Sequence, residues 1–107
     1  MHVQIVNFQL DGMSEAEFRA TSEYLAPAFA AVPGLISKTW LADPASNTYG
    51  GVYLWDGEAA CRAYQESELF NAVKTHPHFA NLISREFGVL DGPSRVTRAA
   101  GAALATA

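Results

Sequence analysis

The sequence predicts an α+β fold in which four antiparallel strands form one sheet and the helices pack on one of its faces. Segments of strand character and segments of helical periodicity alternate in the order βαββαβ. The link between the second and third strands is only a few residues long, which requires an antiparallel pair. The chain has 107 residues and half of them are hydrophobic, which suits a single domain.

The first strand and the first helix have clear boundary signals. Residues 3–10 are rich in β-branched and apolar side chains and end at Asp11-Gly12. Ser14 and Glu17 have the spacing of a capping box, so the helix should begin there. The apolar residues of this helix recur at helical spacing and predict one buried stripe. They are Phe18, Leu25, Ala28, Phe29 and Val32.

Two prolines affect this helix. Pro27 lies inside the helical pattern and removes a backbone donor, which predicts a kink or a break near Leu25. Pro33-Gly34 predicts the end of the helix.

A hairpin and a second helix follow. Residues 35–42 and 49–55 predict two strands, joined by a cluster of turn residues at 43–47. Asp56 offers an N-cap for a helix over residues 57–67. The side chains expected on its inner side are Ala60, Ala63, Tyr64 and Phe70.

The last third of the chain predicts a short helix, a strand and a tail. Residues 69–79 indicate a further helical turn that Pro77 terminates. In residues 82–90 two sets of side chains alternate along the chain, which predicts a fourth strand. The folded domain should span residues 1–98, with residues 99–107 as a flexible Ala-rich tail.

This order of elements is the split-βαβ or ferredoxin-like arrangement, with helices on one face of the sheet. The first and fourth strands carry apolar residues at both odd and even positions, so the other sheet face is apolar as well. A second copy would cover that face, which predicts a homodimer formed by packing sheet against sheet.

Composition excludes several classes of protein. The net charge is −4 and the seven Lys and Arg residues are scattered, which argues against nucleic acid as a partner. Cys61 is the only cysteine, so an internal disulfide is excluded and a reducing compartment is expected. Neither a secretion signal nor a membrane span is visible, and we therefore expect a cytoplasmic protein.

The segment from Lys38 to Tyr64 contains the strongest candidate for a binding site. Its strands end in aromatic residues, and the following helix aims a tyrosine back at them, which predicts an apolar pocket for a small aromatic molecule. Each of these aromatic residues has an alternative role in the hydrophobic core. The predicted substrate-binding residues are Trp40, Tyr53, Trp55, Tyr64 and Phe70.

Three polar residues are candidates for catalysis, and each has an alternative. Asn7 lies midway along an apolar strand, where it contacts a ligand or bonds a neighbouring backbone group. Lys38 shares a strand face with Trp40 and either stabilises an oxyanion or pairs with an acid at the dimer seam. His76 has a suitable pKa range for a general base, or it is a loop element.

We predict no metal site and no cofactor. His76 and His78 form a His-x-His pair, but no third ligand is near them in the sequence. Cys61 has no partner for nucleophilic catalysis. Gly50-Gly51 is followed by no helix and is therefore not a phosphate loop; it indicates a bulge or a close approach of another backbone or a ligand.

Several short blocks resemble the YdhR-like proteins, a family of monooxygenases in the dimeric α/β-barrel superfamily. The blocks are Pro33-Gly34-Leu35, Lys38-x-Trp40, Gly50-Gly51-Val52-Tyr53-Leu54, Ala60-x-x-x-Tyr64, Lys74-x-His76-Pro77 and Phe87-x-Val89. The resemblance covers residues 3–98 and implies a ferredoxin-like, dimeric α/β barrel.

The resemblance also implies oxygen chemistry without flavin or a dedicated metal. The superfamily includes haem-degrading enzymes, to which Ala60, Tyr64, Ser67 and Phe70 are similar, with Asn7 at their polar pocket position. However, Tyr64 stands where those enzymes carry Trp, and Lys74 stands where they carry an iron-ligating His. Both differences argue against haem degradation.

We therefore expect a cofactor-independent monooxygenase that binds an aromatic or polycyclic phenol in an apolar pocket between helices and sheet. One alternative is a cofactor-free isomerase or cyclase that uses the same polar groups for proton transfer. Another alternative is a non-catalytic protein that binds an apolar metabolite.

Overall fold

The computed structural model describes residues 1–97, and these contain eight elements of secondary structure. The strands are β1 (His2–Leu10), β2 (Leu35–Asp43), β3 (Thr48–Trp55) and β4 (Phe79–Gly88). The helices are α1 (Glu15–Ala30), α2 (Glu58–Gln65), α3 (Glu68–Lys74) and α4 (Asp91–Val96).

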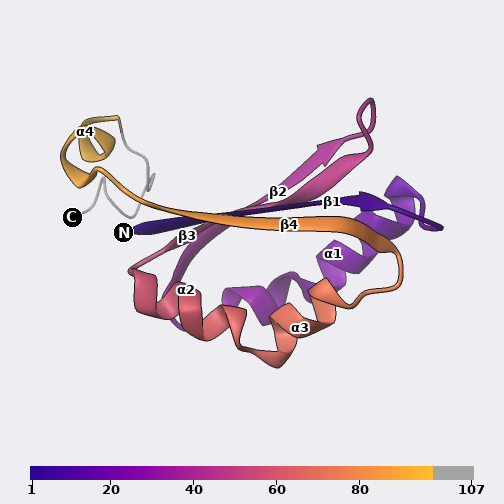
Figure 1. The fold of residues 1–107 in the computed structure, drawn as a ribbon, viewed down its shortest axis with the longest axis horizontal. Coiled ribbons are helices and arrows are strands. Elements are labelled where there is room, and N and C mark those ends of the chain that lie inside the picture. The colour runs from indigo at the N-terminus through magenta and orange to yellow at the C-terminus, as the bar shows by residue number, and fades with distance from the viewer. Residues whose placement is uncertain (98–107) are drawn as a thin grey trace.

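The sheet has the order β2-β3-β1-β4, and each neighbouring pair is antiparallel. Figure 1 shows α1, α2 and α3 together on one side of this sheet, whereas α4 lies beyond the end of β4, near the N-terminus. The predicted ferredoxin-like α+β fold is confirmed. Among residues 1–97, no helix is both long and apolar enough to span a bilayer.

Alternation along β1 decides which side chains meet the helices. Gln4, Val6 and Phe8 are buried on the helix side, whereas Ile5 and Asn7 are only partly buried. Successive side chains of a strand point to opposite faces, so Ile5 and Asn7 lie on the other face, which we call the open face.

The glycine pair of β3 brings two strands close together, as the sequence analysis expected. Gly50 has φ of +148°, and a Cβ atom there would lie 1.8 Å from the carbonyl oxygen of Val6 on β1. A Cβ atom on Gly51 would lie 2.8 Å from Cε of Lys38. Gly50 therefore allows the backbones to approach, and Gly51 leaves space for a lysine side chain.

Helix α1 begins as predicted but does not break. The capping box of Ser14 and Glu17 is formed, with the Ser14 hydroxyl accepting from the Glu17 N–H at 3.1 Å. We expected a kink or a break near Leu25; the helix continues through Pro27 to Ala30, so a break is wrong. The packing of Phe18 and Phe29 against the sheet keeps both halves in one helix despite the missing backbone donor.

The start of α2 differs from the prediction. Gly57, not Asp56, is its N-cap residue, and no side chain caps the helix there. The Asp56 N–H instead donates to the carbonyl of Gly34 at 2.8 Å, which ties the end of β3 to the loop before β2. The predicted helix over residues 57–67 ends earlier, because Ser67 caps a separate α3.

The C-terminal boundaries also shift. Helix α3 ends at Lys74, and β4 begins at Phe79, three residues earlier than the predicted strand over 82–90. Helix α4, which was not predicted, follows β4 within the predicted domain; Pro93 in its first turn loses no helical hydrogen bond. The predicted tail, residues 99–107, lies outside the described residues.

Candidate functional site

A layer of aromatic rings fills the space between the helices and the middle of the sheet. The Tyr64 ring lies 5.3 Å from the ring of Tyr53, 5.1 Å from that of Trp55 and 5.0 Å from that of Phe70. All four residues are buried. Trp40 joins the layer through Phe29, whose ring centroid is 5.3 Å away. The five predicted binding residues therefore form one continuous cluster.

Two hydroxyl groups in this layer pair with each other. Tyr53 Oη and Tyr64 Oη are 3.1 Å apart. Burial raises the pKa of Tyr53 to about 12 and raises the pKa of Tyr64 further. Both phenols therefore stay neutral at physiological pH, and neither is suited to act as a base.

Lys38 on β2 places its amino group among the aromatic rings. Its Nζ atom is 3.4 Å from the ring centroids of both Phe29 and Trp40 and 4.7 Å from that of Tyr53. Within residues 1–97, no carboxylate forms an ion pair with it. Desolvation lowers the pKa of Lys38 to about 7, so the amine and the ammonium forms coexist near neutral pH.

Three hollows follow the seam between α1 and β2, and Trp40 lines all of them. One of about 300 Å³ lies beside Phe18, Ser22 and Ala26. A second, of about 270 Å³, includes Lys38 in its lining. A third, the inner hollow of about 30 Å³, shares Ser22 and Trp40 with the first and Lys38 and Trp40 with the second. We call these three hollows together the seam pocket.

Ser22 is a polar residue of the seam pocket that the sequence analysis missed. Its hydroxyl oxygen is buried and has no hydrogen-bond partner within residues 1–97. A buried hydroxyl without a partner is costly, so this atom is suited to receive a hydrogen bond from a bound molecule or donate one to it. A serine inside an amphipathic helix carries no sequence signal of its own, which is why it was not found.

The other two predicted catalytic residues lie elsewhere. Asn7 is on the open face, where it lines a hollow with Ile5, Ile83, Arg85 and Phe87. His76 follows α3, and its ring stacks on Phe79 with a centroid distance of 4.0 Å. The structure therefore brings Lys38 together with the aromatic cluster, but it does not bring Asn7 or His76 into the seam pocket.

Comparison with known families matches residues 3–100 to the family described as "Putative mono-oxygenase ydhR". The chain belongs to this family. A search of the curated proteins finds no significant match for this YdhR-family chain.

Solved structures share the fold of this YdhR-family protein. SnoaB from Streptomyces nogalater, a cofactor-independent oxygenase, is 25% identical with a TM-score of 0.65, covering 83% of this chain and 93% of that one. A dimeric ferredoxin-like protein of unknown function from Thermobifida fusca is 22% identical with a TM-score of 0.64, covering 83% and 92%.

A haem-degrading protein also has this fold. MhuD from Mycobacterium tuberculosis, solved with two haems bound in its active site, is 20% identical with a TM-score of 0.67, covering 84% of this chain and 96% of that one. At this identity the similarity shows the fold alone. Lys74, which stands where the resemblance places an iron-ligating His, is the last residue of α3. Its Nζ atom lies 5.2 Å from the Phe70 ring centroid.

Proposed function

We propose that this YdhR-family protein is a cofactor-independent monooxygenase for an aromatic or polycyclic phenolic molecule. Membership of the family and the likeness to SnoaB support the oxygen chemistry. The observation that carries the proposal is the amino group of Lys38, which lies between two aromatic rings at 3.4 Å. An aromatic substrate that stacks in this region would place its acidic proton beside an amine.

The seam pocket would hold the substrate. Its hollow of about 300 Å³ is at the lower end of the range for small-molecule sites, and its lining is mainly apolar. The inner hollow of about 30 Å³ holds no more than a water molecule. Trp40 lines all three hollows and Lys38 lines two of them, so a polycyclic molecule would enter by moving these two side chains.

Lys38 would act as the base in this reaction. Its pKa of about 7 leaves part of the population as the free amine at neutral pH, ready to accept a proton. The ammonium that results would then stabilise the substrate anion in a site with little water. Ser22 would offer its unpaired hydroxyl to the same anion.

The oxygen step needs only the substrate anion and molecular oxygen. With an anthrone as substrate, Lys38 takes one proton from the reacting CH₂ group. The anion transfers one electron to oxygen, and the radical pair combines into a peroxide that the Lys38 ammonium protonates. Loss of water converts the peroxide to the ketone, so one oxygen atom stays in the product and the other leaves as water.

Oxygen uptake with a panel of hydroquinones and anthrones tests this function. We expect one O₂ consumed per product, ¹⁸O from ¹⁸O₂ in the new carbonyl, and a loss of at least tenfold in kcat for Lys38→Met. Lys74→Met, which removes a lysine outside the seam pocket, should keep wild-type activity. Turnover without oxygen would instead indicate an isomerase or cyclase, and binding without turnover would indicate a carrier protein.

We also propose that two copies pack through their open faces. Ile83 and Phe87 on β4 are 54% and 50% exposed, and Val3, Val52 and Leu54 line a hollow of about 480 Å³ on this face. An apolar sheet face of this kind is costly to leave in water. The similar protein from Thermobifida fusca is described as dimeric, which supports the proposal.

A further inference from the structure

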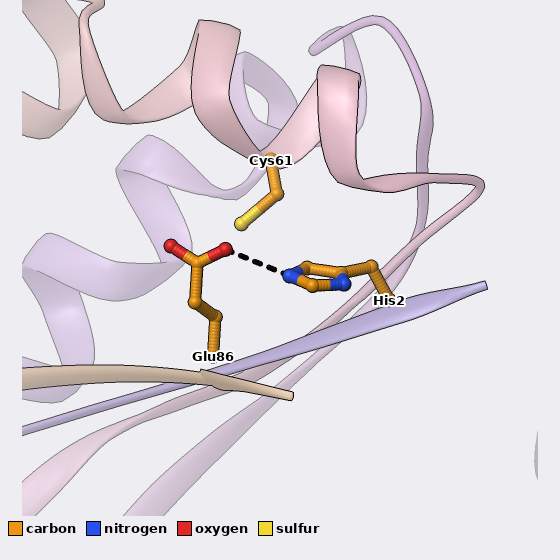
Figure 2. Close-up of side chains that lie close together, drawn as sticks. All are labelled: His2, Cys61 and Glu86. Atoms are coloured by element: carbon orange, nitrogen blue, oxygen red, sulfur yellow. Dashed lines mark hydrogen bonds and ion pairs between the residues drawn. The ribbon is translucent and has the colours of Figure 1, made fainter. Parts of the chain in front are cut away.

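Three side chains with different metal-binding groups meet at one end of the sheet (Figure 2). His2 comes from β1, Cys61 from α2 and Glu86 from β4, and their ligand atoms all lie within 4.8 Å of one another. His2 Nε2 lies 2.7 Å from Glu86 Oε1. The Cys61 sulfur points toward the same carboxylate in Figure 2.

The fold holds all three residues in place. Gln4 pairs with Glu86 and His2 pairs with Gly88 in the register of β1 and β4, which puts His2 and Glu86 on the helix side of neighbouring strands. Cys61, a residue of α2, is fully buried, whereas the side chains of His2 and Glu86 are 12% and 33% exposed. Glu86 is therefore the most exposed of the three ligands, and an ion would reach the site from its side.

Neighbouring residues orient these groups. Gln65 Nε2 donates to Glu86 Oε2 at 2.6 Å and to Cys61 Sγ at 3.3 Å. Met1 places its amino group 3.4 Å from the Asp91 carboxylate, which anchors the chain directly before His2. Metal sites in proteins depend on such outer hydrogen bonds for the direction of their ligands.

We propose that His2 Nε2, Cys61 Sγ and the Glu86 carboxylate bind one divalent cation of the zinc class. Imidazole, thiolate and carboxylate are the ligands of zinc, and three of them leave a fourth position for water. Bonds of about 2.0–2.3 Å to a tetrahedral ion place the ligand atoms about 3.3–3.6 Å apart. His2 and Glu86 need to separate by only about 0.6 Å from their present contact when the ion replaces the shared proton.

This site is separate from the proposed oxygenase chemistry. None of its three residues lines the seam pocket, so the ion has no part in the reaction of Lys38. Its role is to link β1, α2 and β4, which are far apart in the sequence. No metal site was predicted from the sequence, and this cluster carries no local signal, because α1, β2 and β3 lie between His2 and Cys61 in the chain.

Cobalt titration of the untagged, reduced protein tests the proposal. Cys61 is the only cysteine, so a thiolate-to-cobalt charge-transfer band reports on this site alone. We expect the band to saturate at one Co²⁺ per chain and to disappear when Zn²⁺ is added. Cys61→Ser should abolish the band, and His2→Gln and Glu86→Gln should each weaken binding at least tenfold. His78→Gln, a histidine outside the cluster, should leave binding unchanged.

A second measurement on the wild-type protein keeps the test independent of how the variants fold. Zn²⁺ should raise the Tm, and a chelator should reverse the rise, because an ion that binds only the native state stabilises it. The absence of the charge-transfer band, or a band that Zn²⁺ does not displace, overturns the proposal. Equal cobalt affinity in wild type and folded Cys61→Ser overturns it as well.

Discussion

Lys38 is the residue on which the proposed chemistry depends, and its surroundings act against its positive charge. Phe29, Trp40 and Tyr53 provide cation–π contacts but replace the water that would solvate an ammonium group. This desolvation disfavours the charged form and lowers the pKa of Lys38. Gly51 makes this arrangement possible, because a Cβ atom there would lie 2.8 Å from Cε of the lysine.

Replacing Lys38 with methionine should raise the stability at neutral pH more than at alkaline pH. Between pH 7 and 10.5 the unfolded chain holds a proton on Lys38 that the native state lacks, so the free energy of unfolding of the wild type rises with pH. Below about pH 7 both states are protonated, and the full penalty, on the order of 5 kcal/mol at most, is present.

Urea unfolding of wild type and Lys38→Met at pH 7 and pH 10 measures this difference. The stability gain of the variant should shrink as the pH rises. Lys74→Met, which removes a lysine outside the seam pocket, is the control for the loss of a lysine side chain. A gain for Lys38→Met that is equal at both pH values contradicts a lowered pKa for Lys38.

The aromatic residues of the candidate site were predictable from the sequence, but the position of Asn7 was not. Trp40, Tyr53 and Tyr64 follow from strand alternation and from the helix after the hairpin. Asn7 differs because β1 is apolar on both faces, so alternation does not reveal which face meets the helices. Only the pairing of the strands places Asn7 on the open face.

At the scale of elements, α1 contains an unfavourable residue that its packing tolerates. Pro27 lies inside the helix and lacks the backbone N–H that would bond to the preceding turn. The residue is exposed, so it contributes little packing of its own. The buried rings of Phe18 and Phe29 on either side hold the helix against the sheet.

Replacing Pro27 with alanine should stabilise the protein by about 1–3 kcal/mol, because alanine restores the missing donor and has the highest helix propensity. Denaturant unfolding monitored by circular dichroism measures the change. Ala28→Pro, one residue further along the same exposed stretch, should destabilise the protein instead. A Pro27→Ala variant less stable than wild type contradicts this account of α1.

Element boundaries were predicted well where local chemistry sets them and poorly where tertiary contacts do. The capping box of Ser14 and Glu17 and the turn at residues 43–47 act through neighbouring residues, and both agree with the structure. The start of β4 depends on pairing with β1, where Phe79 lies opposite Leu10. No local signal reports that pairing, so the predicted strand began three residues late.

At the scale of the whole molecule, the open face determines the expected assembly. Ile83 and Phe87 leave half of their surface exposed in the single chain. Phe87→Glu should convert a homodimer into a monomer, because a carboxylate would be buried without a partner at the interface. Light scattering should give twice the chain mass for wild type and a single chain mass for the variant.

Tyr24→Glu is the matched control for this experiment. Tyr24 is 84% exposed on α1, on the other side of the sheet, so the same change of side chain should leave the mass unchanged. A wild-type protein that is monomeric at all concentrations, or a Phe87→Glu variant that stays dimeric, contradicts packing through the open face.

The sequence by itself determined the order of the elements, the ferredoxin-like fold and the aromatic character of the candidate site. Periodicity, caps and turn residues act over a few positions, and this range is enough to define helices and strands. The tertiary structure alone decided that Lys38 is desolvated, that the Ser22 hydroxyl finds no partner among residues 1–97, and that His2, Cys61 and Glu86 meet. Each of these depends on strand register and on how a helix crosses the sheet, which bring together residues far apart in the chain.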